Sequence, residues 1–156
     1  MKIEFWCTGK TDDTYLNEGI HKYCKRLINY IPFDFKELIL PKSTKTASPE
    51  QFREEEKKDV LKRLKPGDFL ILLDDKGKGF TSEKFAEFLQ KKFNDAPKNI
   101  IFLSGGAYGF HEEIYARADF KFSLSEMTFT HQMVRLIFVE QLYRAMTILR
   151  NEPYHH

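Results

Sequence analysis

Residues 68–79 read DFLILLDDKGKG, and residues 100–109 read IIFLSGGAYG. In both stretches an unbroken apolar run leads into a segment rich in glycine. An apolar run of this kind is typical of a strand that is buried on both faces of a parallel sheet. Glycines after such a strand let backbone amides approach a ligand closely. The two stretches therefore predict two buried strands and two loops, 74–79 and 105–109, where a ligand could bind.

The rest of the chain alternates between strand and helix patterns. Further strands are expected at residues 2–8, 33–40 and 120–124. Apolar periodicity and capping signals predict helices at residues 16–31, 49–64, 82–93 and 130–150, with a short helix starting near residue 111. Residues 41–49 are expected to form a mobile loop. This alternation predicts an α/β fold with a mainly parallel sheet flanked by helices, and we expect one domain over residues 1–156.

Two of the predicted helices differ in apolar content. The last helix is apolar around most of its circumference, so it needs cover from the sheet, from its neighbours or from a second subunit. We favour the second subunit and expect a homodimer. The helix from Pro49 starts with a capping box made by Ser48 and Gln51 and has only a thin apolar stripe. Its charged run, Glu54–Lys58, is therefore expected to face solvent and to form intrahelical ion pairs.

Composition and charge exclude several classes of protein. The chain has 156 residues, 42% hydrophobic and 31% charged, so we expect a folded protein rather than a disordered one. Its 25 Lys and Arg against 23 Asp and Glu give a net charge of +2, which neither indicates nor excludes nucleic-acid binding. Cys7 and Cys24 are too few for a disulfide framework, and we expect both to be core thiols.

Signals for a metal, for export and for a membrane are missing from the sequence. No cysteine or histidine spacing suits a metal site. The segment Met1–Trp6 lacks the apolar core of a signal peptide, and no apolar run approaches the ~18 residues of a membrane span. We therefore expect a cytoplasmic protein that binds neither metal nor membrane.

Common nucleotide-binding fingerprints do not fit the glycine-rich segments. Gly77 and Gly79 would need a third glycine or an alanine at Ser82 to make a dinucleotide fingerprint, and the chain has no P-loop sequence. No nucleophilic triad is visible either. An oxidoreductase that binds a nicotinamide cofactor is therefore disfavoured.

Three sets of polar residues leave alternatives open. Asp74 and Asp75 are either a carboxylate pair or turn formers. His131 is either a base or ligand, or a residue that caps the last helix. Glu140 and Arg144 are either an intrahelical ion pair, or Arg144 faces a phosphate or a partner subunit.

Six short motifs occur in order along the chain. They are LLD at 72–74, LSGGAYG at 103–109, LSEMTF at 124–129, HQMVR at 131–135, EQLYRA at 140–145 and PYH at 153–155. Together, over the whole chain, they resemble the RlmH family of SPOUT (α/β-knot) methyltransferases. The resemblance implies a homodimer with a trefoil knot in its C-terminal region, and S-adenosylmethionine bound by the knot loops. It also implies methylation of N3 of a pseudouridine in 23S ribosomal RNA on the assembled ribosome.

The resemblance also implies which residues form the site. The cofactor should be bound by Leu73, Gly105, Leu124, Ser125, Glu126, Met127, Thr128 and Phe129. Because the N3 proton must leave, a general base would assist, and the candidates are His131, Tyr154 and His155, with Arg144 stabilising the base or holding a phosphate. The family usually has proline where this chain has Thr130, and threonine could restore order there as a helix cap. The alternative function is a non-catalytic ribosome-binding factor on the same fold.

Overall fold

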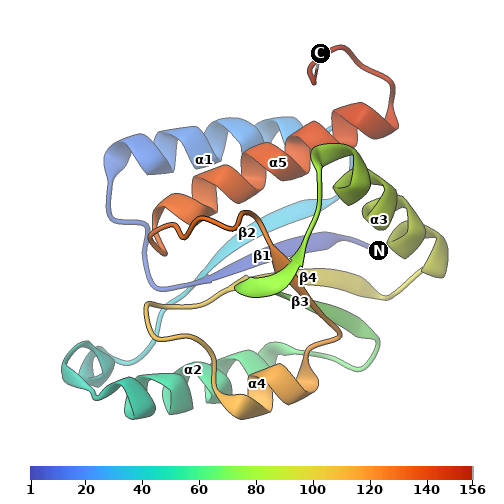
Figure 1. The fold of residues 1–156 in the computed structure, drawn as a ribbon. Coiled ribbons are helices and arrows are strands. Elements are labelled where there is room, and N and C mark those ends of the chain that lie inside the picture. The colour runs from blue at the N-terminus through green and yellow to red at the C-terminus, as the bar shows by residue number, and fades with distance from the viewer. Residues whose placement is uncertain (156) are drawn as a thin grey trace.

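The computed structural model describes residues 1–155, in which a five-stranded sheet has helices on both faces (Figure 1). His156, which ends the predicted domain, lies outside the described residues. The strands are β1 (Ile3–Thr8), β2 (Phe33–Leu38), β3 (Asp68–Gly79), β4 (Asn99–Ser104) and β5 (Phe120–Ser123). Their order in the sheet is β2-β1-β4-β3-β5, and every pair is parallel. The predicted α/β fold with a parallel sheet is confirmed, while the knot stays a prediction.

The helices form two layers. One face of the sheet carries α1 (Thr14–Leu27), α3 (Ser82–Asp95) and α5 (Met133–Leu149), and the other carries α2 (Pro49–Arg63) and α4 (Glu112–Arg117), as Figure 1 shows. Side chains alternate between the two layers along each strand: Phe5 and Cys7 join the core under α1 and α5, whereas Trp6 joins the core under α2. Cys7 is therefore the core thiol that the sequence predicted, while Cys24 is half-buried.

Helix α5 lies between α1 and α3, and this position explains much of its apolar surface. Phe138 is fully buried, with its ring centroid 4.4 Å from that of Phe5 and 4.6 Å from that of Phe102. A Cβ at Gly19 on α1 would lie 2.8 Å from Leu136 Cδ1, so the glycine allows α1 to pack closely on α5. Three sides of α5 are thus covered by the sheet and two helices, and one side faces outward.

Two loop predictions were wrong. Residues 41–49 contain a short 3-10 helix, η1 (Lys42–Thr46). Residues 74–79 are not a loop but the second half of β3, which pairs with β5 through Lys78 and Gly79 after an irregularity that follows Leu73. Close approach makes this pairing possible, because a Cβ at Gly77 would lie 2.6 Å from the carbonyl carbon of Lys121. Glycine therefore marks strand contact here rather than a turn.

At the helix ends, the structure agrees better with the predicted capping residues than with the predicted helix lengths. Ser48 Oγ accepts the Gln51 N–H at 3.2 Å and Gln51 Oε1 accepts the Ser48 N–H at 3.1 Å, which confirms the capping box. Helix α5 starts at Met133, and Thr130 Oγ1 accepts the Met133 N–H at 3.1 Å. The hydroxyl of Thr130 therefore supplies the order that the sequence analysis suggested in place of the family proline.

The charged run on α2 is only partly solvated. Lys57 and Lys58 pair with glutamates three residues earlier, at 2.7 Å and 3.6 Å. Glu56, however, is fully buried, so the prediction that the whole run faces solvent was wrong for this residue. The reason is a tertiary contact: Glu56 faces the loop after β4, where Oε2 accepts the N–H of Gly106.

Candidate functional site

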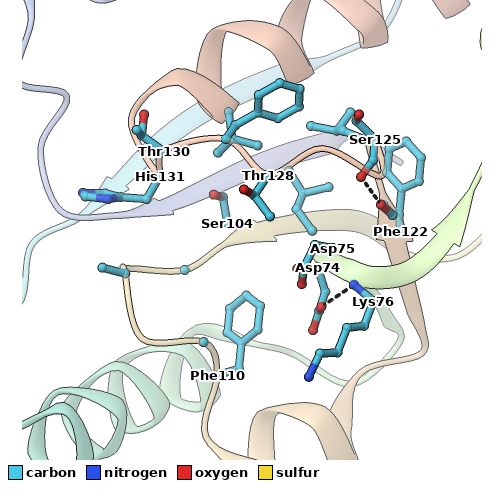
Figure 2. A pocket seen from close by; sticks show the side chains of 18 of the residues that line it. Asp74, Asp75, Lys76, Ser104, Phe110, Phe122, Ser125, Thr128, Thr130 and His131 are labelled. Carbon is cyan, nitrogen blue, oxygen red and sulfur yellow. Dashed lines mark hydrogen bonds between the residues drawn. The ribbon is translucent and has the colours of Figure 1, made fainter.

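A cavity of about 620 Å³ opens where β3, β4 and β5 end (Figure 2). Its lining comes from residues 73–76 of β3, residues 104–107 with Gly109 and Phe110 after β4, and residues 122–125 and 127–131 after β5. The carboxyl ends of parallel strands meet at one edge of a sheet, which is where ligands bind in open α/β folds. The three segments that the sequence singled out therefore form one pocket.

Most of the predicted cofactor residues line this cavity. They are Leu73, Gly105, Leu124, Ser125, Met127, Thr128 and Phe129. Glu126 is absent from the lining, although it belongs to the same motif. Met127 and Phe129 are 76% and 39% exposed. Large apolar side chains exposed at the rim of a pocket favour a site that a ligand or a partner covers.

Close packing explains the two glycines after β4. A Cβ at Gly105 would lie 2.8 Å from the ring of Phe110, and a Cβ at Gly106 would lie 2.5 Å from the ring of Phe52 on α2. The wall of the pocket is therefore bare backbone pressed between two phenylalanines. Opposite it, Ser125 Oγ accepts the Met127 N–H at 3.0 Å and fixes the turn after β5.

A carboxylate lies at the polar end of the cavity. Asp74 accepts the Lys76 N–H at 2.9 Å (Figure 2) and the Tyr115 hydroxyl at 2.8 Å. Burial pushes the pKa of Asp74 upward, but these hydrogen bonds outweigh it and the pKa is lowered. Burial and the bond to Asp74 raise the pKa of Tyr115 to about 12. Asp74 lies within β3 rather than in the turn that the sequence allowed, and its carboxylate offers a negative charge to a cationic ligand group.

The predicted catalytic residues do not lie together. His131 lines the cavity beside the start of α5. Arg144, Tyr154 and His155 gather near the other end of that helix, and none of them lines the cavity. Eleven residues of helix separate Met133 from Arg144, which at ~1.5 Å per residue is on the order of 16 Å. Figure 1 shows the C-terminal end of α5 far from its start.

The C-terminal tail is docked on three helices. Arg144 Nη2 donates to Glu140 Oε1 at 2.6 Å, which confirms the intrahelical ion pair, and Arg144 Nη1 lies 3.2 Å from His155 Nδ1. The hydroxyl of Tyr154 donates to the same Glu140 oxygen at 3.1 Å, and His155 Nε2 lies 2.8 Å from Glu83 Oε1 on α3. Burial and the hydrogen bonds raise the pKa of Tyr154, so its phenol is neutral in this arrangement.

Sequence reasoning missed Arg135, which has a structural part in the site. Its side chain is fully buried and donates to the backbone oxygens of Thr8 at 2.8 Å and Gly9 at 2.9 Å, and to that of His131 at 3.3 Å. Arg135 therefore ties the end of β1 to the segment that carries His131. A cation in the first turn of a mostly apolar helix, four residues after His131, was the available signal. Tyr115, which binds Asp74 from α4, gave no such signal.

Within residues 1–155, no helix is both long and apolar enough to cross a membrane. The same residues contain no group of three or more His, Cys, Asp or Glu side chains arranged to hold a metal ion.

Comparisons with known proteins agree with the motifs. The family described as "Predicted SPOUT methyltransferase" matches residues 1–155. Proteins called "Ribosomal RNA large subunit methyltransferase H" are similar over 100% of this chain: that of Parabacteroides distasonis is 53% identical over 99% of its length, and that of Cytophaga hutchinsonii 52% over 100%. A third, from Christiangramia forsetii, is 51% identical over 99% of its length. With half of its residues shared along its whole length, this chain belongs to the SPOUT methyltransferase family, as the six motifs predicted.

Proposed function

We propose that this chain transfers a methyl group from S-adenosylmethionine to N3 of a pseudouridine in 23S ribosomal RNA, on the assembled ribosome. Family membership implies a methyl donor. The name shared by the relatives supports ribosomal RNA of the large subunit as the substrate. The observation that carries the proposal is that three segments bearing family motifs line one cavity. We further propose that the protein acts in the cytoplasm and is a single domain with the trefoil knot that its family resemblance implies.

The residues around the cavity suit this donor. A volume of about 620 Å³ lies within the ~300–1,000 Å³ usual for small-molecule sites. Leu73, Leu124 and Phe129 supply apolar surface for an adenine ring, and the Gly105 backbone can approach it without a Cβ. The carboxylate of Asp74 suits a cationic group of the donor. S-adenosylmethionine supplies the electrophilic methyl carbon when it is bound.

The protein's own part in the reaction is to position the nucleophile and to accept its proton. N3 of the base becomes a nucleophile when it loses its proton, and His131 at the cavity rim can accept that proton on its imidazole. Tyr154 is a poor base while hydrogen bonding and burial raise its pKa. Arg144 keeps its charge because Glu140 raises its pKa, so it can hold a phosphate of the RNA.

The separation of His131 from the tail supports a homodimer. Arg144, Tyr154 and His155 lie too far along α5 to act at the cavity of their own chain. Two copies related by a twofold axis, with their α5 helices in opposite directions, would bring the tail of one chain to the cavity of the other. The outward side of α5 and the exposed side chains of Met127 and Phe129 give such a contact apolar surface.

Mass spectrometry of 23S ribosomal RNA tests the reaction. In a deletion strain, the pseudouridine should lose its N3 methyl group, and the intact gene should restore it. Gly105→Val should not restore it, because its side chain would collide with Phe110 and displace the backbone that lines the cavity. A pseudouridine that keeps its methyl group in the deletion strain excludes the proposed substrate. Calorimetry with S-adenosylmethionine separates the enzyme from a ribosome-binding factor, which would not bind the donor.

Two tail variants test the catalytic assignments. His155→Ala and Tyr154→Phe should bind the donor normally, since neither residue lines the cavity. If the tail supplies or orients the base, single-turnover methylation of ribosomes should fall by about 100-fold or more. Unchanged turnover in both variants would show that the tail is not catalytic.

A further inference from the structure

One turn of α2 supports the backbone wall of the cavity that Gly105 and Gly106 form. Glu56 is fully buried, and its Oε2 accepts the N–H of Gly106 at 3.1 Å. Phe52, four residues earlier and so on the same face of the helix, packs so tightly on Gly106 that a Cβ there would lie 2.5 Å from its ring. Arg53 adds a third contact, from Nη1 to the carbonyl oxygen of Tyr108 at 3.2 Å. The loop after β4 is thus attached to α2 by three contacts, two at Gly106 and one at Tyr108.

The surroundings of Glu56 are unusual for a carboxyl group. Within residues 1–155 no cationic nitrogen lies within 4.0 Å of it, and Oε1 makes no hydrogen bond. The buried hydroxyl of Thr8, at the end of β1, likewise makes no hydrogen bond in that part of the chain. Burial raises the pKa of Glu56, while Thr8 and the Gly106 amide oppose this effect. A buried carboxyl with no cation is costly, so a specific contact must justify it.

We propose that Glu56 is a positioning residue for the donor: it accepts the N–H of Gly106 and so fixes the backbone wall of the cavity. The peptide between Gly105 and Gly106 is planar, so its carbonyl points away from the N–H that Glu56 binds. Glu56 therefore sets the direction in which the Gly105 carbonyl is offered. The effect of Glu56 on donor binding rests on the proposed function, whereas its effect on the conformation of the loop after β4 does not.

Three variants separate positioning from stability. Glu56→Gln keeps an acceptor for Gly106, whereas Glu56→Met fills the space without an acceptor. Val60→Ala is the matched control: Val60 is also fully buried on α2, one turn further on, but packs in the core beneath the helix. Circular dichroism establishes a temperature at which all are folded. Calorimetry then measures S-adenosylmethionine affinity, and NMR measures exchange of the Gly106 amide.

The expected pattern is specific. Glu56→Met should weaken donor binding by about 5- to 30-fold and speed Gly106 exchange by about tenfold, because a buried N–H loses its acceptor. Glu56→Gln should stay within about twofold of wild type in both measurements, and Val60→Ala should bind the donor normally although it is less stable. Wild-type values in Glu56→Met, equal losses in Glu56→Gln, or an equal loss of affinity in Val60→Ala would each overturn the proposal.

Two further outcomes keep the proposals distinct. If the wild type binds no donor but Glu56→Met still speeds Gly106 exchange, the proposed function fails and the positioning of the loop stands. If Glu56→Met does not fold, Glu56→Leu carries the test, because it also removes the acceptor for Gly106 but fills the space with a branched side chain. It should weaken donor binding and speed Gly106 exchange, and unchanged values in both would overturn the proposal.

Discussion

At the scale of single residues, the groups around Asp74 in the pocket determine its protonation state. Burial alone would favour the neutral acid, yet the Lys76 amide and the Tyr115 hydroxyl keep the carboxylate ionised by lowering its pKa. Tyr115 in turn is held as a neutral phenol, with its pKa raised to about 12. The carboxyl of Asp74 is thus kept charged and the phenol of Tyr115 is kept neutral, and these are the protonation states that their hydrogen bond requires.

Replacing Tyr115 with phenylalanine should remove this coupling. We expect a loss of about 0.5–1 kcal/mol in unfolding free energy, at the low end for a hydrogen bond to a charged group because Tyr115 is partly exposed. The lowered pKa of Asp74 contributes stability above its unfolded value of 3.8, and the raised pKa of Tyr115 contributes stability below its unfolded value of 10.0. The difference from wild type should thus be largest between these two pH values.

Urea unfolding at a series of pH values measures this difference. Tyr108→Phe is the control, because Tyr108 lies in the neighbouring loop and its hydroxyl makes no hydrogen bond within residues 1–155. The difference between wild type and Tyr115→Phe should shrink as the pH falls below 3.8 and as it rises above 10.0. A difference that is independent of pH, or one shared by Tyr108→Phe, would contradict the coupling.

At the scale of elements, the second half of β3 shapes the cavity. Residues 73–76 line the site, and pairing of Lys78 and Gly79 with β5 anchors them from the far side. Gly77 makes this possible, since backbone atoms of Lys121 and Phe122 occupy the space where a side chain would begin. The irregular pairing between Leu73 and Lys78 bends β3 and so directs residues 73–76 toward the cavity.

Gly77→Ala should therefore separate β3 from β5. The new methyl group would meet backbone atoms at 2.6–2.7 Å, which no rotamer change relieves, so unfolding free energy should fall by about 1–3 kcal/mol. Gly79→Ala, two residues on, meets nothing within 4 Å and should change stability by no more than about 1 kcal/mol. Urea unfolding of both variants checks this. Equal destabilisation would mean that the close approach at Gly77 has no energetic weight.

How far the sequence predicts this structure depends on whether the deciding contact is local. The strands, the capping box at Ser48 and the three segments that line the cavity follow from residues near one another in the chain, and all are found in the structure, although the first segment is strand rather than loop. The course of β3 through Gly77 and the burial of Glu56 depend on partners 44 and 50 residues away, so local patterns pointed to a turn and to a solvated face. The separation of His131 from Arg144, in contrast, was predictable, because the sequence places both on one helix that rises ~1.5 Å per residue.

At the scale of the whole molecule, that separation predicts complementation between two inactive proteins. Gly105→Val should lack a donor site and His155→Ala should lack a working tail, so each alone should be inactive. In a mixed dimer, the cavity of the second chain meets the intact tail of the first and completes one site. Random exchange of subunits makes about half of the dimers mixed, so activity should recover to about a quarter of that of wild type.

Ribosome methylation after subunit exchange measures the recovery, and light scattering at twice 18.5 kDa verifies that dimers are present. The double variant, with both substitutions in one chain, is the control: mixed with either single variant it leaves every site without a cavity or without a tail, and should restore nothing. Because Arg144 and His155 lie a helix length from their own cavity, recovery requires that catalysis be shared between chains. Exchanged but inactive mixtures would mean that the tail serves its own chain, through a movement along α5.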